Sequence, residues 1–139
     1  MTRWESYHAL PGYPEHPDVV KLLERLYSTS EVFKGQVLGD YHPRLVQLRL
    51  SDRVELLCYT REGDVAYAAA LVHEYDGNVG ECITICMAVG DPKYASLMCS
   101  RYVIRMAMEI ARQHNIKWIA YSHTINRHKV LIKYKEVGV

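Results

Sequence analysis

The fold is decided by residues 89–139, which read VGDPKYASLMCSRYVIRMAMEIARQHNIKWIAYSHTINRHKVLIKYKEVGV. Between Ala95 and His114, apolar residues recur at helical spacing and charged residues occupy the other positions, which predicts a helix over 95–114. Residues 117–122 (KWIAYS) follow as a short, largely buried strand. A final helix is expected over roughly 127–136, closed by Gly138.

Upstream of this stretch the hydrophobic period is first helical and then alternating. Residues 18–29 carry apolar side chains at helical spacing behind Asp18, a good capping residue, and predict a helix. Residues 31–44 contain two glycines and Pro43 and are expected to form a loop. Four segments then alternate as strands do, and they are 45–50 (LVQLRL), 54–60 (VELLCYT), 65–75 (VAYAAALVHEY) and 79–89 (VGECITICMAV).

The order of these elements predicts an α+β (α/β) fold with a mixed, mainly antiparallel sheet. The turn Asp76-Gly77-Asn78 joins strands 65–75 and 79–89 as a hairpin, because glycine tolerates a positive φ. The helix between strands 79–89 and 117–122 is a crossover, which makes those two strands parallel neighbours. A length of 139 residues fits one domain, expected over 18–139.

Residues 1–17 are expected to form an irregular N-terminal arm outside that domain. They contain Pro11, Gly12, Pro14 and Pro17 among several aromatic residues. Such a segment becomes ordered when something binds its aromatic side chains, Trp4, Tyr7 and Tyr13.

Composition and charge narrow the classes of function. The formal net charge of +1 argues against nucleic acid as the main ligand, since non-specific binding needs a strong positive field. Charge is uneven, however, because residues 112–135 hold six Lys or Arg and no acidic residue. This segment is either a solvated helix face or a surface for phosphates or an acidic partner. No apolar run has the length of a membrane span or of a leader, so an intracellular protein is expected.

The four cysteines, Cys58, Cys82, Cys86 and Cys99, form no C-x-x-C pair. Small reduced thiols in the core are therefore expected rather than a zinc site. Cys82 and Cys86 lie four residues apart in a predicted strand and should point to the same face.

Several short motifs stand in an order that resembles the GNAT superfamily of N-acetyltransferases. Asp91-Pro92-Lys93-Tyr94 follows the fourth strand, Ala111-Arg112-Gln113-His114-Asn115-Ile116 ends the long helix, and Asn126 precedes Tyr134-Lys135-Glu136-Val137-Gly138-Val139. The resemblance covers about residues 54–139 and implies helices on both faces of the sheet. The same C-terminal sequence resembles more loosely the small GNAT-like internal virion proteins of T7-type phages. That second resemblance would place the chain in a virion.

The resemblance implies that acetyl-coenzyme A lies in a splay between the fourth and fifth strands. Pantetheine would pair with the end of the fourth strand, and the pyrophosphate would sit on unpaired N–H groups at the start of the long helix. The implied cofactor-binding residues are Met87, Val89, Ala95, Ser96, Leu97, Met98, Cys99, Ser100 and Asn126. Ala95, Met98 and Ser100 replace the family's usual Arg or Gln and two small residues, which predicts weakened cofactor binding.

Three residues are candidates for the chemistry that the resemblance implies. Tyr134 occupies the place of the tyrosine that protonates the departing thiolate, although it also suits an apolar core position. Glu81 is the carboxylate of the fourth strand, but it lies about 26 Å from Val89 along an extended strand, so a water chain would be needed. His123, just past the fifth strand, is either nearer the amine or a loop histidine.

Two functions follow from these patterns. The first is an acetyl-coenzyme A-dependent N-acetyltransferase with an eroded pyrophosphate loop. The second is a GNAT-like scaffold without catalysis, such as a phage virion or accessory protein. That scaffold would bind a protein partner, or a second copy of itself, through its N-terminal arm and basic last helix. The family continues into two further strands after its last helix, so the arm, a second subunit or an open acceptor side is expected at that edge.

Overall fold

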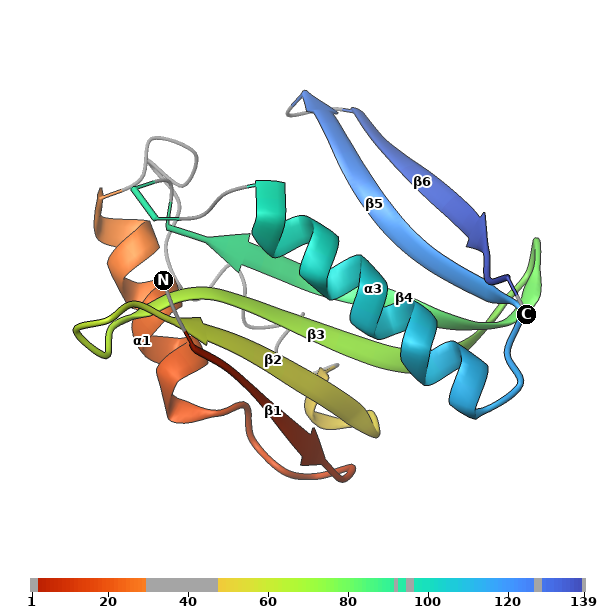
Figure 1. Cartoon of the computed structure of the whole chain (residues 1–139), viewed down its shortest axis with the longest axis horizontal. Helices are drawn as coiled ribbons and strands as arrows, with labels where there is room; N and C mark the ends of the chain where they lie inside the picture. Colours follow the sequence, from red (N-terminus) through yellow and green to blue (C-terminus); the bar gives the residue numbers. More distant parts are fainter. Residues whose placement is uncertain (1–2, 30–47, 92, 95–96, 127–128, 139) are drawn as a thin grey trace.

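The computed structural model describes residues 3–29, 48–91, 93–94, 97–126 and 129–138. These residues form a six-stranded sheet with helices packed against it (Figure 1). The elements are β1 (Arg3–Ala9), α1 (Pro17–Thr29), β2 (Arg53–Tyr59), β3 (Val65–Asp76), β4 (Gly80–Gly90), α3 (Leu97–Gln113), β5 (Trp118–Asn126) and β6 (Lys129–Glu136). The strands lie in the order β1-β2-β3-β4-β5-β6, with β4 and β5 parallel and every other pair antiparallel.

One helix covers each face of the sheet, as expected from the sequence. α1 buries Val19, Leu22, Leu23 and Leu26 against one face, and α3 buries Cys99, Val103, Ala107 and Ala111 against the other. The central strand β3 contributes to both cores, because Ala68 and Ala70 face α1 while Ala69 and Leu71 face α3. Small alanine side chains on β3 let both helices approach the sheet closely.

The prediction of a last helix over 127–136 is wrong, because residues 129–136 form strand β6. β6 pairs with β5 in an antiparallel ladder that runs from Trp118 opposite Glu136 to Asn126 opposite Lys129. The sequence KVLIKYKE contains Val130, Ile132 and Tyr134, residue types that favour strands over helices. β5 is also longer than predicted, since it continues to Asn126.

The prediction of an irregular N-terminal arm is wrong over residues 3–9, because these residues form strand β1. β1 pairs with β2 from Arg3 opposite Tyr59 to Ala9 opposite Arg53. The indole of Trp4 stacks on the ring of Tyr102 in α3, with 4.0 Å between ring centroids. The aromatic residues of this segment therefore pack on the chain's own sheet and helix.

The strand predicted over 45–50 is also wrong where it can be tested. Residues 48 and 49 belong to a helical turn that ends at Leu50, and Ser51 N–H donates to the carbonyl oxygen of Leu48 at 3.0 Å. Residues 45–47 and the loop predicted over 31–44 lie outside the described residues.

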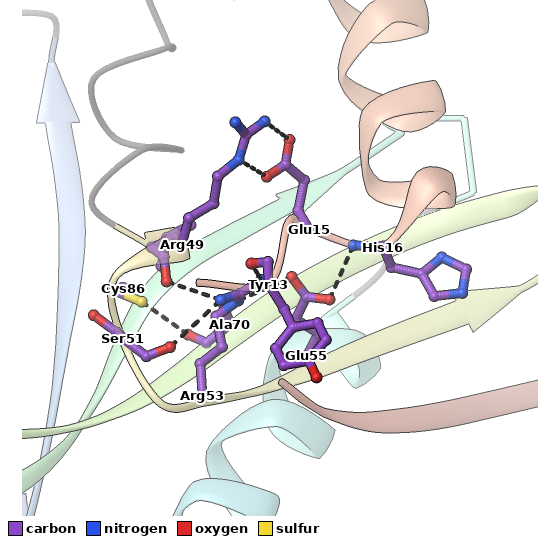
Figure 2. Close-up of polar contacts among 10 residues, drawn as sticks. Tyr13, Glu15, His16, Arg49, Ser51, Arg53, Glu55, Ala70 and Cys86 are labelled. Atoms are coloured by element: carbon purple, nitrogen blue, oxygen red, sulfur yellow. Dashed lines mark hydrogen bonds and ion pairs between the residues drawn. The ribbon is translucent and has the colours of Figure 1, made fainter. Parts of the chain in front are cut away.

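A buried arginine connects this turn to the segment before α1 (Figure 2). The guanidinium of Arg53, whose side chain is 1% exposed, donates to the carbonyl oxygens of Tyr13 and Leu48, both at 2.9 Å. It also donates to the carboxylate of Glu55 at 3.2 Å, and that carboxylate accepts the backbone N–H of His16 at 3.1 Å. Arg53 thus supplies donors to carbonyl groups of two segments that lie outside the sheet.

We expect Arg53→Met to lower the free energy of unfolding by about 3–5 kcal/mol, because it leaves the Glu55 carboxylate buried without its cation. Urea denaturation followed by circular dichroism measures the change. The matched control Arg61→Met, in the exposed β2–β3 turn, should stay within about 0.5 kcal/mol of wild type. An Arg53→Met protein as stable as this control would show that the network contributes nothing to stability.

Candidate cofactor site

The sheet divides where the parallel ladder between β4 and β5 stops. That ladder joins Cys82–Ile85 to Trp118–Tyr121, a length of four residue pairs. β4 then continues to Gly90 and β5 to Asn126, and Figure 1 shows the β5–β6 ribbon rising away from β4. We call the opening between residues 86–90 and residues 122–126 the splay. The two strands therefore separate after Ile85 and Tyr121, at the position where the resemblance implied a splay.

A β-bulge lies at the mouth of the splay. Ala70 of β3 pairs with Met87 and its neighbour Leu71 with Ile85, so Cys86 is the extra residue. The bulge reverses the alternation of β4, because Ile83 and Ile85 pack on the α3 side while Met87 and Val89 pack on the α1 side.

Cys82 and Cys86 point to the same face, as predicted, because Cys82 pairs with Glu74 and the thiol of Cys86 lies near Glu74 and Arg53 on the α1 side (Figure 2). Cys82 is buried, whereas the side chain of Cys86 reaches the surface and its thiol donates to the carbonyl oxygen of Ala70 at 3.3 Å. The change of face at Met87 could not be predicted from the sequence, because the hydrophobic pattern of VGECITICMAV does not indicate a bulge.

The end of β4 presents an open backbone edge to the splay. Residues 87–90 keep their pairing to β3, from Ala70 to Tyr67, but in the described residues no strand pairs with their other side. The side chains of Met87 and Val89 are buried toward α1, so they leave this edge clear. An extended molecule with amide groups can pair with such an edge as an added strand would.

The first turn of α3 follows this edge after a short connection. Met98 is 74% exposed, so its side chain points to solvent and not into the core. Cys99 is buried, and Ser100 hydrogen-bonds to the phenol of Tyr67, whose pKa is raised mainly by burial. Ala95 and Ser96 lie outside the described residues, as does the side chain of Leu97. The free N–H groups of this first turn still provide a site that favours an anion.

An ion pair that the sequence did not indicate holds the connection between β4 and α3. Asp91 N–H donates to the carbonyl oxygen of Ala66 at 2.9 Å, and the Asp91 carboxylate accepts the backbone N–H of Lys93 at 3.0 Å. The same carboxylate lies 3.2 Å from Nε of Arg25 on α1. Because Arg25 also donates to the carbonyl oxygen of Val65, α1 is fixed to the end of the sheet where the splay opens.

The structure separates the predicted catalytic residues into two groups. The backbone of His123, like that of the predicted cofactor residue Asn126, lies on the part of β5 beyond its ladder to β4, which borders the splay. Glu81 lies one residue before the ladder begins, and its carboxylate binds Nε2 of exposed His73 at 2.7 Å. The distance from Glu81 to the end of β4 therefore remains the obstacle that the sequence indicated.

Tyr134 belongs to β6 and not to a helix, level with the Thr84–Ala120 pair of the ladder, and its side chain reaches away from the splay. Its hydroxyl donates to Oδ2 of Asp76 at 3.0 Å and accepts from Nδ2 of Asn78, also at 3.0 Å. Both partners belong to the hairpin between β3 and β4. We therefore propose no catalytic role for Tyr134.

No family model matches the sequence, and no curated protein is similar enough to match it. Solved structures do match the fold. A GNAT-family acetyltransferase from Staphylococcus aureus Mu50 has a TM-score of 0.58 at 14% identity, over 87% of this chain and 73% of that one. An aminoglycoside 6′-N-acetyltransferase from Acinetobacter baumannii has a TM-score of 0.60 at 13% identity, over 91% and 83%. A GNAT-family acetyltransferase from Listeria monocytogenes has a TM-score of 0.51 at 13% identity, over 90% and 79%.

The chain thus has the fold of the GNAT acetyltransferases, with the mixed sheet and flanking helices predicted from its sequence. Nothing in these comparisons supports the looser resemblance to phage virion proteins. Neither described helix has both the length and the hydropathy of a membrane-crossing segment.

We expect the Cys86 thiol to react slowly at neutral pH. Burial, and to a smaller extent the nearby Glu74 carboxylate, raises the pKa of this thiol to about 12. The thiolate is the reactive form, so the rate of alkylation by iodoacetamide should still rise about tenfold per pH unit between pH 8 and 10. Mass spectrometry of the labelled peptide measures the rate, with Cys86→Ser as the control. A rate that levels off near pH 9 would contradict the raised pKa.

Proposed function

We propose that the chain binds acetyl-coenzyme A in the splay and transfers its acetyl group to an amine. The observation that carries this proposal is the open edge of β4 over residues 87–90, which leads directly to the free N–H groups of α3. An extended pantetheine arm offers amides to the first, and a pyrophosphate offers negative charge to the second. The GNAT acetyltransferases with the same fold support the choice of ligand.

The residues present fit such a ligand, with one predicted weakness. The side chains of Met87 and Val89 are turned away from the splay, so the backbone of β4 is accessible. Met98 replaces a small residue of the family loop, but its exposed side chain leaves the core side of the turn free. Each charge-assisted hydrogen bond that the pyrophosphate lacks would cost about 1.5–3 kcal/mol, so binding in the high micromolar to millimolar range is expected.

The chemistry needs little from the protein beyond positioning. Acetyl-coenzyme A supplies an acetyl thioester, which is already activated toward an amine. The amine nitrogen forms a bond to the acetyl carbon, the carbon–sulfur bond breaks, and the ammonium proton must leave as the thiolate is protonated. Holding the amine and the thioester together accounts for much of the rate in such a reaction. His123 is the predicted residue nearest this reaction, from its place on β5.

A scaffold that binds another protein is the second candidate, and one surface favours it. Leu131 and Ile132 are consecutive on edge strand β6 and are 43% and 61% exposed. Consecutive residues point to opposite faces of a strand, so both faces of the ribbon carry apolar surface near its tip. The proposed partner or second copy would therefore contact the β5–β6 ribbon and not the N-terminal segment.

Acetyl-coenzyme A should raise the melting temperature in a thermal-shift assay, since a ligand at one hundred times its dissociation constant adds about 2.7 kcal/mol. Adenosine 3′,5′-bisphosphate, which lacks pantetheine, should bind at least tenfold more weakly because it cannot pair with β4. Absence of any shift at about 10 mM acetyl-coenzyme A, a concentration at which a site with a millimolar dissociation constant still adds about 1.4 kcal/mol, would exclude this function.

The position of the ligand is tested with Ala88→Trp. Ala88 is an exposed residue of β4 within the splay, so a large side chain there should weaken acetyl-coenzyme A binding at least tenfold, as measured by isothermal titration. Glu81→Trp places the same side chain on an exposed position of β4 outside the splay and should bind like wild type. Equal loss in both variants would place the ligand elsewhere.

For the scaffold, we expect Leu131→Ser with Ile132→Ser to abolish association while leaving acetyl-coenzyme A binding unchanged. These side chains are exposed on edge strand β6, with β5 between them and the splay, so the change removes apolar surface. Sedimentation velocity of the wild type at increasing concentration, compared with the double variant, measures self-association. A wild type that stays monomeric would remove the second-copy form of this candidate.

A further inference from the structure

The β5–β6 ribbon is joined to β4 at one end and extends freely beyond it. We call the joined part, which is the four-pair ladder, the base of this lever and the free end its tip. Only four residue pairs join it to β4, whereas β5 runs five residues further, from Ser122 to Asn126. At about 3.3 Å per residue this free length is about 16 Å, so a rotation of about 10° at the base moves the tip about 3 Å. Hydrogen bonds are broken by shifts of roughly 0.5 Å. The width of the splay therefore depends strongly on the angle of the ribbon.

Three polar side chains connect the base of this lever to the opposite part of the sheet. Tyr134 on β6 donates to Asp76 at the end of β3 and accepts from Asn78 in the β3–β4 turn, with both distances 3.0 Å. These hydrogen bonds cross over β5, because Tyr134 pairs with Ala120 and Ala120 pairs with Thr84 of β4. In Figure 1 the β3–β4 turn and the carboxyl end of β6 lie together, at the end of the sheet away from the splay.

We propose that Tyr134, Asp76 and Asn78 form a latch that fixes the angle of the β5–β6 ribbon and so positions acetyl-coenzyme A in the splay. This role rests on the proposed function, and Tyr134 is a positioning residue in it. A single tyrosine reaches from β6 past β5 to the β3–β4 hairpin, so it joins the two parts of the sheet that the short ladder leaves weakly connected. The small side chain of Ala120 beneath it leaves room for that reach.

The chemistry of the latch makes it persistent at neutral pH. The pKa of Asp76 is lowered because its carboxylate accepts the backbone N–H of Asn78 and, to a smaller extent, the hydroxyl of Tyr134. Since the folded-state pKa is depressed, the ionised latch is complete above the ordinary aspartate range and is lost only as the pH falls through the lowered pKa. At neutral pH the hydroxyl of Tyr134 therefore donates to an ionised carboxylate.

The latch is tested without ligand by the distance between spin labels at Glu62→Cys and Leu131→Cys, in a Cys86→Ser background. Glu62 lies in the exposed β2–β3 turn and Leu131 near the tip of the ribbon, so pulsed electron paramagnetic resonance reports the angle between them. Tyr134→Phe should broaden or shift the distance distribution. Tyr75→Phe removes a phenol from the same hairpin without touching the latch, because Tyr75 is 85% exposed, and should leave the distribution unchanged.

The consequence for binding is measured separately. Tyr134→Phe should weaken acetyl-coenzyme A binding about two- to tenfold, the effect of losing one or two hydrogen bonds, with turnover at saturating ligand unchanged. Reduced turnover with unchanged binding would instead make Tyr134 a proton donor and overturn the latch. An unchanged distance distribution would overturn it as well. If wild type binds no acetyl-coenzyme A, the proposed function and the cofactor-positioning role both fail, while the distance measurement still decides whether the latch fixes the ribbon.

Discussion

The parallel ladder between β4 and β5 joins four residue pairs and then ends at Ile85 and Tyr121. Strands β1 to β4 on one side of it carry a helix on each face, and the β5–β6 ribbon on the other side extends past the ladder. Because β4 keeps its bonds to β3 and loses its neighbour on the other side, its last residues present backbone groups that need a partner. The same break in pairing thus creates both the binding edge and the lever.

On the α1 side of the molecule, charged side chains hold together segments that lie outside the sheet. Arg53 collects carbonyl oxygens from the segments around Tyr13 and Leu48, and Arg49 donates two hydrogen bonds of 2.7 Å to Glu15, as Figure 2 shows. The Arg49 guanidinium also lowers the pKa of Glu15. Both segments lie outside the sheet, where the buried guanidinium of Arg53 supplies donors to backbone carbonyl groups and the more exposed Arg49 pairs with the Glu15 side chain.

Local periodicity predicted the elements whose burial is one-sided or complete, and these include α1, β2, β3, β4 and α3. It failed where pairing with a distant segment decides the structure. KVLIKYKE becomes a strand because β5 offers it a full antiparallel ladder, and residues 3–9 become a strand because β2 has an open edge. The splay followed from family resemblance. The bulge at Cys86 and the hydrogen bonds of Tyr134 could not be predicted, since both depend on register and on groups far apart in the chain.

The bulge at Cys86 divides β4 into two parts, and odd-numbered side chains point to opposite faces of the sheet in the two parts. Ile83 and Ile85 pack on the α3 side, and the odd-numbered residues from Met87 onward pack on the α1 side. Removal of Cys86 would make Ile85 and Met87 neighbours in a regular strand, where consecutive residues face opposite sides, so Met87 and Val89 would keep their places against α1. Loss of Cys86 therefore keeps the packing of both faces, whereas loss of any other residue inside the paired part of β4 would turn the side chains beyond it to the opposite face.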